Sequence, residues 1–166
     1  AAGIACDTVP GISAAQGAAA ATGIPLTHRD HAAMLVFATG HLQGEEGERT
    51  VALDWAALAR PHQTVVIYMG VGTLPIICAQ LIAHGLPAST PAAMIERATL
   101  PGQRSIVGTL QTLPQLSVAY GVNPPALVMI GDTVALHARI GSSAEVLTGF
   151  PAVVDAASPQ ALACTA

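Results

Sequence analysis

The chain has 166 residues, a length that favours one domain or one domain with a fragment of another. Hydrophobic residues make up 52% of it and aromatic residues only 3%, so Ala, Val, Leu and Ile must build the core, as in a layered α/β protein. The formal net charge of −4, with no basic run, argues against a nucleic-acid partner. All six Lys and Arg positions are Arg, which excludes a lysine-based mechanism within this chain.

The first quarter of the chain predicts an extended segment, a helix and a strand. Residues 4–9 are an extended run that a Pro-Gly pair stops. Ser13 stands at a helix N-cap position before an Ala-rich helix that reaches about Thr22 and ends at Gly23. After a polar loop, residues 33–39 have the composition of a buried strand.

The middle of the chain predicts a helix, a strand and a second helix. Asp54 can cap a short helix, and residues 64–69 (TVVIYM) give the strongest strand signal. A helix that Thr73 caps then runs to His84. The stretch 64–83 is the most apolar of the chain, but two glycines and a proline interrupt it. A strand–turn–helix unit therefore explains it better than a membrane span.

The last part predicts an antiparallel pair of strands, a helix and a final strand. The pair consists of residues 91–98 and 104–110, Thr112 can cap the helix, and the final strand covers residues 126–130. Because strands and helices mostly alternate around one hairpin, we expect an αβα sandwich with a mixed sheet. Residues 142–166 show no clear periodicity, and we expect them to form a loosely ordered tail.

Two turns have features of ligand-binding sites. Gly70-x-Gly72 joins a strong strand to a helix, where the backbone can approach a ligand closely and the helix N-terminus favours anions. The full dinucleotide fingerprint fails because Pro75 occupies the place of its third glycine. The bend before Ser13 likewise leaves room for a ligand against backbone N–H groups. A tight connection explains the first feature equally well, and a simple N-cap is the favoured explanation of the second.

Titratable groups gather in the loop after the first helix. His28, Asp30 and His31, with His41 further on, are competent ligands for zinc or iron, but their spacing matches no established signature. A hydrogen-bonded loop beside a cleft is the alternative. Four arginines fall in predicted loops or at element ends, where they could meet a polycarboxylate or serve as solvated surface charges. They are Arg29, Arg60, Arg97 and Arg104.

The cysteines indicate a reducing compartment. Cys6, Cys78 and Cys164 are odd in number and form no CxxC pair, which argues against a disulfide scaffold or a structural zinc site. No signal peptide opens the chain, and we expect a cytoplasmic protein. The sequence starts without Met, so we also expect part of the natural amino terminus to be missing.

Several runs of the sequence resemble one protein family, in the same order along the chain. They are VPGISAAQGAAAATGIPLTHRDHA, ATGHL, LDWAALARPHQTVVIYMGVGTLP, LIAHGLPASTPAAMIERAT, QRSIVGTLQTLP and ALVMIGDTVALH. The family is that of the uroporphyrinogen-III C-methyltransferases, either free-standing or as the carboxyl-terminal module of siroheme synthase. GIPLTHRD together with QTVVIYMG is its most specific signature here. The resemblance covers about residues 2–140.

The resemblance implies an S-adenosylmethionine-dependent enzyme of two α/β domains with a cleft between them, acting as a homodimer. Its reaction would be methylation of uroporphyrinogen III at C2 and C7, giving precorrin-2 for siroheme and cobalamin. No metal is implied. Residues 1–12 would be the end of the amino-terminal domain and a linker. Residues 13–141 would be the carboxyl-terminal domain, which binds S-adenosylmethionine and the tetrapyrrole.

The resemblance also assigns residues to the cofactor. Ser13, in place of the usual Thr, Ala14, Met69 and Ala98, in place of the usual Gly, would contact S-adenosylmethionine. The backbone contact at Ala98 survives if its φ is negative, whereas a positive φ would add strain. Arg29 is our candidate to meet a substrate carboxylate, and His28 our candidate to order the loop that carries it.

The family's amino-terminal GxGPGD loop, its GGDP loop and its proposed catalytic Asp and Lys have no counterpart in this chain. We therefore expect no catalytic residue here and no activity from the chain by itself. One alternative is a module that binds S-adenosylmethionine or a tetrapyrrole without turnover. Another is a metal-dependent hydrolase that uses His28, Asp30 and His31.

Overall fold

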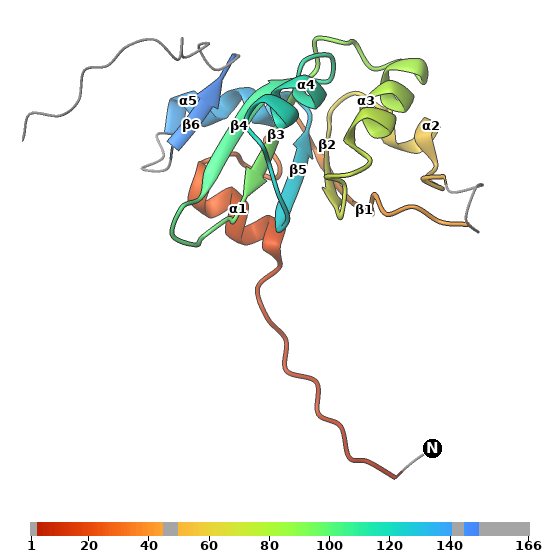
Figure 1. The fold of residues 1–166 in the computed structure, drawn as a ribbon, viewed down its shortest axis with the longest axis vertical. Coiled ribbons are helices and arrows are strands. Elements are labelled where there is room, and N and C mark those ends of the chain that lie inside the picture. Colours follow the sequence, from red (N-terminus) through yellow and green to blue (C-terminus); the bar gives the residue numbers. More distant parts are fainter. Residues whose placement is uncertain (1–2, 45–49, 141–144, 150–166) are drawn as a thin grey trace, which may run out of the picture.

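The computed structural model describes residues 3–44, 50–140 and 145–149 of the chain. Within them, one six-stranded sheet runs through the molecule (Figure 1). In spatial order its strands are β1 (Met34–Thr39), β2 (Gln63–Tyr68), β5 (Ala126–Ile130), β3 (Pro91–Glu96), β4 (Arg104–Thr109) and β6 (Glu145–Thr148). The outer pairs β1–β2 and β4–β6 are parallel, and the pairs between them are antiparallel. The sheet is therefore mixed, as the sequence predicts.

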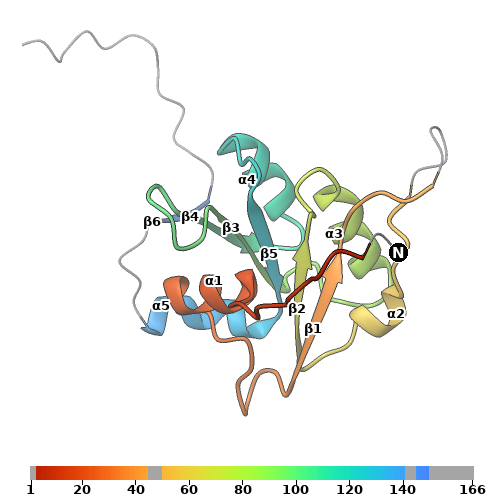
Figure 2. The same ribbon diagram turned by 90° about the horizontal axis from the view of Figure 1, so that it is seen from below.

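Helices cover both faces of this sheet (Figure 2). One face carries α1 (Ala14–Thr22), the 3-10 helix η1 (Asp132–Leu136) and α5 (His137–Ile140). The other face carries α2 (Trp55–Leu58), α3 (Leu74–Ala83) and α4 (Leu113–Ala119). This arrangement is the predicted αβα sandwich.

The central strand β2 shows why the core has two parts. Val65 and Ile67 pack into the cluster beneath α3 and α4, whereas Val66 packs into the cluster beneath α1. All three are at most 1% exposed. A strand buried on both faces requires apolar residues at successive positions, which is the continuous run that the sequence shows.

The first helix has the predicted ends. The Ser13 hydroxyl accepts the Ala15 N–H, and the Gln16 side chain accepts the Ser13 N–H at 3.1 Å, which completes a capping box. Gly23 ends the helix with a φ of 71°, a left-handed conformation that glycine adopts without steric cost.

Thr73 and Thr112 occupy N-cap positions, as predicted, but neither side chain caps its helix. The Thr73 hydroxyl instead donates to the Gly40 carbonyl at 2.5 Å, and the Thr112 hydroxyl accepts the Thr109 N–H at 2.9 Å. A proline stands in the first turn of each helix, so one N–H fewer needs a partner there. Both threonines tie the helix start to a strand end.

Strand β3 is shorter than the predicted 91–98. It ends at Glu96 because Arg97 and Thr99 have φ values of 51° and 66°, which are incompatible with extended backbone. The chain turns here before returning as β4, with Glu96 paired to Arg104 next to the turn of the hairpin.

The two ends of the described chain differ from each other. Residues 3–12 form no strand, are exposed and lead away from the sandwich (Figure 1). Residues 145–148 form β6 beside β4, where the sequence analysis expects only a loose tail. Four residues are too few for a periodic pattern to be recognised, and their pairing depends on the edge of β4. The rest of the predicted tail lies outside the described residues.

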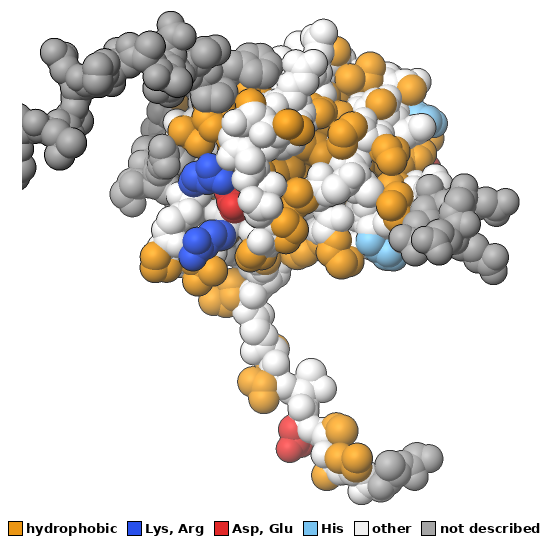
Figure 3. Space-filling model, viewed as in Figure 1, with side chains coloured by type: hydrophobic (Ala, Val, Ile, Leu, Met, Phe, Trp, Pro, Cys, Tyr) orange, Lys and Arg blue, Asp and Glu red, His pale blue; other side chains and the backbone are white. Residues whose placement is uncertain are grey.

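The surface is rich in apolar side chains, as the low content of charged residues requires (Figure 3). Met34 and Phe37 are about half exposed, at 49% and 52%, on the edge strand β1. Among the described helices, none is long and apolar enough to cross a membrane.

Candidate functional site

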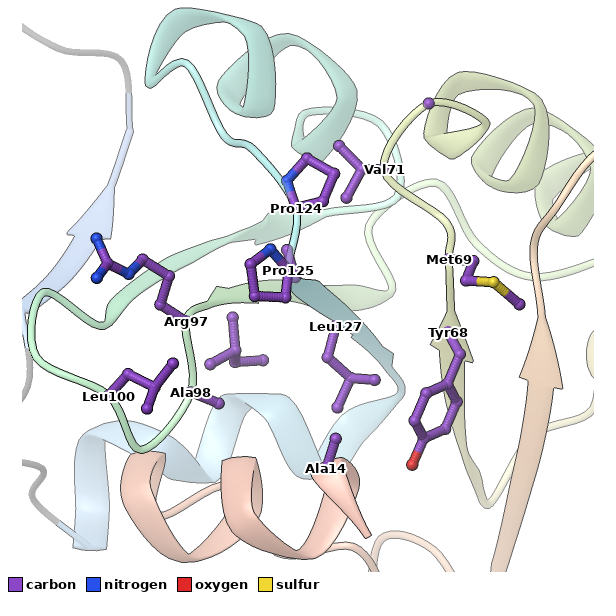
Figure 4. Close-up of a pocket in the computed structure, with 13 residues that line it drawn as sticks. Ala14, Tyr68, Met69, Val71, Arg97, Ala98, Leu100, Pro124, Pro125 and Leu127 are labelled. Atoms are coloured by element: carbon purple, nitrogen blue, oxygen red, sulfur yellow. The ribbon is translucent and has the colours of Figure 1, made fainter.

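A cavity of about 530 Å³ opens at the edge of the sheet where β2 and β3 end and β5 begins (Figure 4). Its volume lies within the range typical of small-molecule sites. The cavity is mostly apolar, and Arg97 is the one charged residue in its lining. The lining consists of Ala14, Tyr68, Met69, Val71, Gly72, Ile95, Arg97, Ala98, Leu100, Pro124, Pro125, Ala126 and Leu127.

The start of α1 forms one wall of this cavity. Ala14 lines it, and Ser13 stands directly before Ala14 without belonging to the lining. The Ser13 hydroxyl forms a hydrogen bond of 2.7 Å with the Tyr68 hydroxyl, and the Ala15 N–H donates to both oxygens, at 3.2 and 3.3 Å. Ser13 therefore holds the wall in place through Tyr68, a lining residue that the sequence analysis did not single out.

The turn after β2 forms a second wall. Met69 lines it with a φ of 54° and a side chain that is 63% exposed. A left-handed conformation at an unbranched apolar residue is strained, and such strain is common at functional sites. The two glycines of this turn differ in role. A Cβ at Gly70 would come within 3.1 Å of Ile67 and 3.3 Å of Ile77, whereas a Cβ at Gly72 would meet nothing within 4 Å. Gly70 serves packing, and Gly72 opens onto the cavity.

The turn after β3 forms a third wall. Ala98 lines the cavity and is not among the residues with positive φ, although its neighbours Arg97 and Thr99 are. Alanine therefore replaces glycine at position 98 without the left-handed penalty. The turn packs closely against α1: a Cβ at Gly17 would lie only 3.2 Å from the Thr99 methyl group.

The segment before β5 closes the cavity with apolar rings and side chains. Pro124, Pro125 and Leu127 line it, and Figure 4 shows them facing the turns that carry Met69 and Ala98. This wall was not predicted from the sequence. The Pro-Pro pair directly before a buried strand was the available signal, because two consecutive prolines present a rigid apolar surface.

The two residues predicted to bind substrate lie outside the cavity lining. Arg29 is exposed and His28 is half-buried in the loop that follows α1, whereas the bend at Ser13 precedes α1. The loop is thus joined to the opposite end of the helix and is not directly beside the bend. His28 does organise its loop: its N–H donates to the Ala32 carbonyl, and its ring accepts the Asp30 N–H at 3.2 Å.

The metal-site alternative finds no support in the described residues. The rings of His28 and His31 lie 4.8 Å apart between centroids and are tilted by 52°, and His28 lies 3.9 Å from an Asp30 oxygen. Within the described part of the chain, no group of three His, Cys, Asp or Glu side chains is placed to hold a metal ion. His41 instead forms a hydrogen bond of 3.0 Å with Thr39.

Neither of the two cysteines in the described part of the chain lines the cavity, and Cys164 lies outside the described residues. Burial raises the pKa of the Cys78 thiol to about 12, because a thiolate in the core beneath α3 would lose its hydration. Cys6 is exposed on the segment before α1, and both are free thiols.

The fold and the cavity define a class of protein. An apolar cavity at the edge where two strands of a sheet end, with helices on both faces of that sheet, is typical of α/β domains that bind small molecules. The model of the Tetrapyrrole (Corrin/Porphyrin) Methylases matches residues 1–114, and the chain belongs to this family.

Curated relatives and solved structures agree with this assignment. The chain is 52% identical over 132 residues to a siroheme synthase of Nitrosomonas europaea and 51% identical over 138 residues to one of Chromobacterium violaceum, matching 80% and 83% of this chain. The uroporphyrin-III C-methyltransferase of Thermus thermophilus complexed with S-adenosyl homocysteine is 32% identical over 81% of this chain, with a TM-score of 0.63. A cobalt precorrin-4 methyltransferase shares the fold at a TM-score of 0.63.

The matches cover only part of those proteins. The chain spans 27% and 28% of the two siroheme synthases and 54% of the Thermus thermophilus methyltransferase.

Proposed function

We propose that the chain forms the carboxyl-terminal side of the active site in an enzyme that methylates uroporphyrinogen III. The reaction transfers methyl groups from S-adenosylmethionine to C2 and C7 and yields precorrin-2. One observation carries the proposal: Ala14, Met69 and Ala98, which lie far apart in the sequence, line the same cavity. These residues were selected by family resemblance alone, and their meeting in one place supports a common ligand.

The cavity suits the adenosine part of such a cofactor. Pro125, Leu127 and Tyr68 offer apolar surface for a flat ring, and the turns after β2 and β3 supply Met69 and Ala98 to the lining. S-adenosylmethionine, when bound, supplies a methyl group on a sulfonium sulfur that a nucleophilic pyrrole carbon can take. Met69 and Ala98 hold and orient the ligand in this proposal, and Ser13 fixes the wall behind it through Tyr68.

Catalysis in this scheme depends mainly on position. Neither a carboxylate nor an imidazole lines the cavity, so its described lining offers no evident general base. This side of the site therefore contributes alignment of donor and acceptor, which by itself accelerates a bimolecular step greatly. The base that takes the pyrrole proton would come from residues outside this chain.

The substrate side of the proposal concerns the arginines. Uroporphyrinogen III carries many carboxylates, and Arg binds carboxylates well because its planar group offers paired donors. We assign Arg29 to one such carboxylate, with His28 ordering its loop, because the Arg29 side chain is exposed in an otherwise hydrogen-bonded loop.

The proposal can be tested on the full-length protein that contains this chain. Isothermal titration with S-adenosylhomocysteine should show binding, and incubation with S-adenosylmethionine and uroporphyrinogen III should yield a dimethylated product. No binding would refute the proposal. The isolated chain should bind the cofactor product weakly or not at all and show no turnover.

A second reading, binding without turnover, rests on the same absence of a base from the described lining. It predicts that the full-length protein binds S-adenosylhomocysteine but leaves uroporphyrinogen III unchanged. The methylation assay separates the two readings.

We also propose a homodimer in the cytoplasm. Half-exposed Phe37 and Met34 on the edge strand β1 offer apolar surface that a second copy could bury, and the free thiols of Cys6 and Cys78 suit a reducing compartment. Light scattering on the full-length protein should give twice the monomer mass, and a monomer would contradict the dimer.

A further inference from the structure

A nearly buried ion pair lies beside the cavity but outside its lining. The Glu96 side chain is 9% exposed and the Arg104 side chain 29%. Arg104 donates from Nε to Glu96 Oε2 at 2.9 Å and from Nη2 to the same oxygen. The two residues face each other at the end of the β3–β4 hairpin, one residue before the turn that carries Arg97 and Ala98.

The remaining polar atoms of this pair bind the segment that leads into β5. Arg104 Nη1 donates to the Tyr120 carbonyl at 3.0 Å, and the Asn123 N–H donates to Glu96 Oε1 at 3.4 Å. Directly next to the pair, the Arg97 N–H donates to the Pro125 carbonyl at 2.9 Å. Both Glu96 and Arg104 are thus hydrogen-bonded to the backbone of the segment that precedes Pro124 and Pro125.

These contacts join two walls of the cavity. Glu96 precedes the Arg97–Ala98 turn, and the backbone of Tyr120 and Asn123 precedes the Pro124–Pro125 wall. The wall lies beside that turn because β5 pairs with β3, and both line the cavity (Figure 4). The side chains of Pro124 and Pro125 have no polar atoms with which to fix themselves. Their position therefore depends on their backbone, which the ion pair holds at Tyr120 and Asn123 and the Arg97 N–H holds at Pro125.

We infer that Glu96 and Arg104 are positioning residues that set the distance between the proline wall and the Ala98 turn, and thereby the affinity of the pocket for S-adenosylmethionine. This inference rests on the proposed function. A buried ion pair is a poor source of net stability, because desolvation offsets most of its attraction. Its directional bonds, in contrast, fix geometry, and a pocket that is displaced by a fraction of an ångström loses ligand contacts.

The test uses titration of S-adenosylhomocysteine into the full-length protein, together with thermal unfolding. Arg104→Lys keeps the charge but loses the guanidinium fork, so it cannot reach both Glu96 and the Tyr120 carbonyl. We expect its Kd to rise about tenfold, the order of loss expected from one charge-assisted hydrogen bond. Ile130→Val, at the far end of β5, is the control: it should lower the melting temperature with little change in Kd.

A double variant separates position from stability. Glu96→Gln with Arg104→Met removes both charges together, so no unpaired buried charge remains and the melting temperature should recover relative to either single change. Methionine cannot bind the Tyr120 carbonyl, so the Kd should stay raised. A Kd that recovers together with the melting temperature would overturn the positioning role.

The outcomes also separate the two proposals. If the unaltered protein does not bind S-adenosylhomocysteine, the proposed function fails, and the inference fails with it. If the unaltered protein binds and the Glu96 and Arg104 variants bind equally well, only the positioning role is refuted.

Discussion

The hydroxyl groups of Ser13 and Tyr68 lie 2.7 Å apart and join the N-cap of α1 to the last residue of β2. Two segments separated by 55 positions thus share one hydrogen bond at the rim of the cavity. The Ala15 N–H donates to both oxygens, so the tyrosine hydroxyl also takes part in the helix cap. Ala14, which lines the cavity, stands between Ser13 and Ala15 in the chain. The bonds of these two residues to the Tyr68 hydroxyl therefore fix the position of one wall of the cavity.

Removing the tyrosine hydroxyl should weaken ligand binding. Tyr68→Phe keeps the ring that lines the cavity and loses the hydroxyl's bonds to Ser13 and to the Ala15 N–H, which retains Ser13 as an acceptor. A typical hydrogen bond contributes about 0.5–1.5 kcal/mol. If that energy holds the pocket in shape, the Kd for S-adenosylhomocysteine rises about twofold to tenfold. Titration calorimetry on the full-length protein measures it.

Ser13 supplies the matching controls. Ser13→Ala should weaken binding by a similar factor, and in combination with Tyr68→Phe it should add little, because both changes remove the same bond. Ser13→Thr keeps the hydroxyl and should bind as well as the unaltered protein. Fully additive effects of the first two changes would contradict the coupling.

Met69 should show opposite effects on stability and on binding. Met69→Gly relieves a left-handed conformation and should stabilise the fold by about 0.5–1 kcal/mol, since little side-chain burial is lost at 63% exposure. It also removes a side chain from the cavity and should weaken binding of S-adenosylhomocysteine. Urea unfolding and calorimetry check the two signs. Tighter binding by the glycine variant would exclude Met69 from the ligand site.

Arg29 should affect the substrate and not the cofactor. Arg29→Ala in the full-length protein should raise the KM for uroporphyrinogen III several-fold and leave the Kd for S-adenosylhomocysteine unchanged, because Arg29 is exposed outside the cavity lining. Arg60→Ala removes another exposed arginine and serves as the matched control. Steady-state kinetics in which both variants behave alike would remove Arg29 from the substrate site.

Cys78 gives a prediction for alkaline pH. Its pKa is raised from 9.0 to about 12 in the native protein, so the folded chain keeps a proton that the unfolded chain loses above about 9. The contribution of this thiol to stability is complete below that value and falls as pH rises toward 12. Urea titrations at about pH 8 and about pH 10.5 should show a larger loss for the unaltered protein than for Cys78→Ala. Equal losses would contradict the shift.

The helices and strands were largely predictable because their signals are local. The capping box of Ser13 and Gln16, the glycine stop at Gly23 and the continuous apolar run of β2 each lie within a few residues of the element they define. The hydroxyls of Thr73 and Thr112 were predicted wrongly. Both sit at the expected positions, but the competing acceptor at Gly40 and the competing donor at Thr109 become available only when the chain is folded.

The residues of the candidate site were likewise predictable only in part. Family resemblance pointed to Ser13, Ala14, Met69 and Ala98, and the structure brings three of them to one cavity and leaves Ser13 behind its wall. Family resemblance did not indicate the proline wall or the contact of Ser13 with Tyr68, since both depend on which strands are neighbours in the sheet. Strand β5 follows β1 to β4 in the chain but enters the sheet between β2 and β3.

The sequence by itself determined the elements, the mixed αβα architecture and the family, because capping, hydrophobic runs and motif residues are properties of the linear chain. The tertiary structure alone decided the pocket. The pairing of β5 with both β2 and β3 brings the Pro124–Pro125 segment against the two turns, and the Glu96–Arg104 pair ties that segment to the β3 end. Such contacts depend on long-range strand order, which no local pattern encodes.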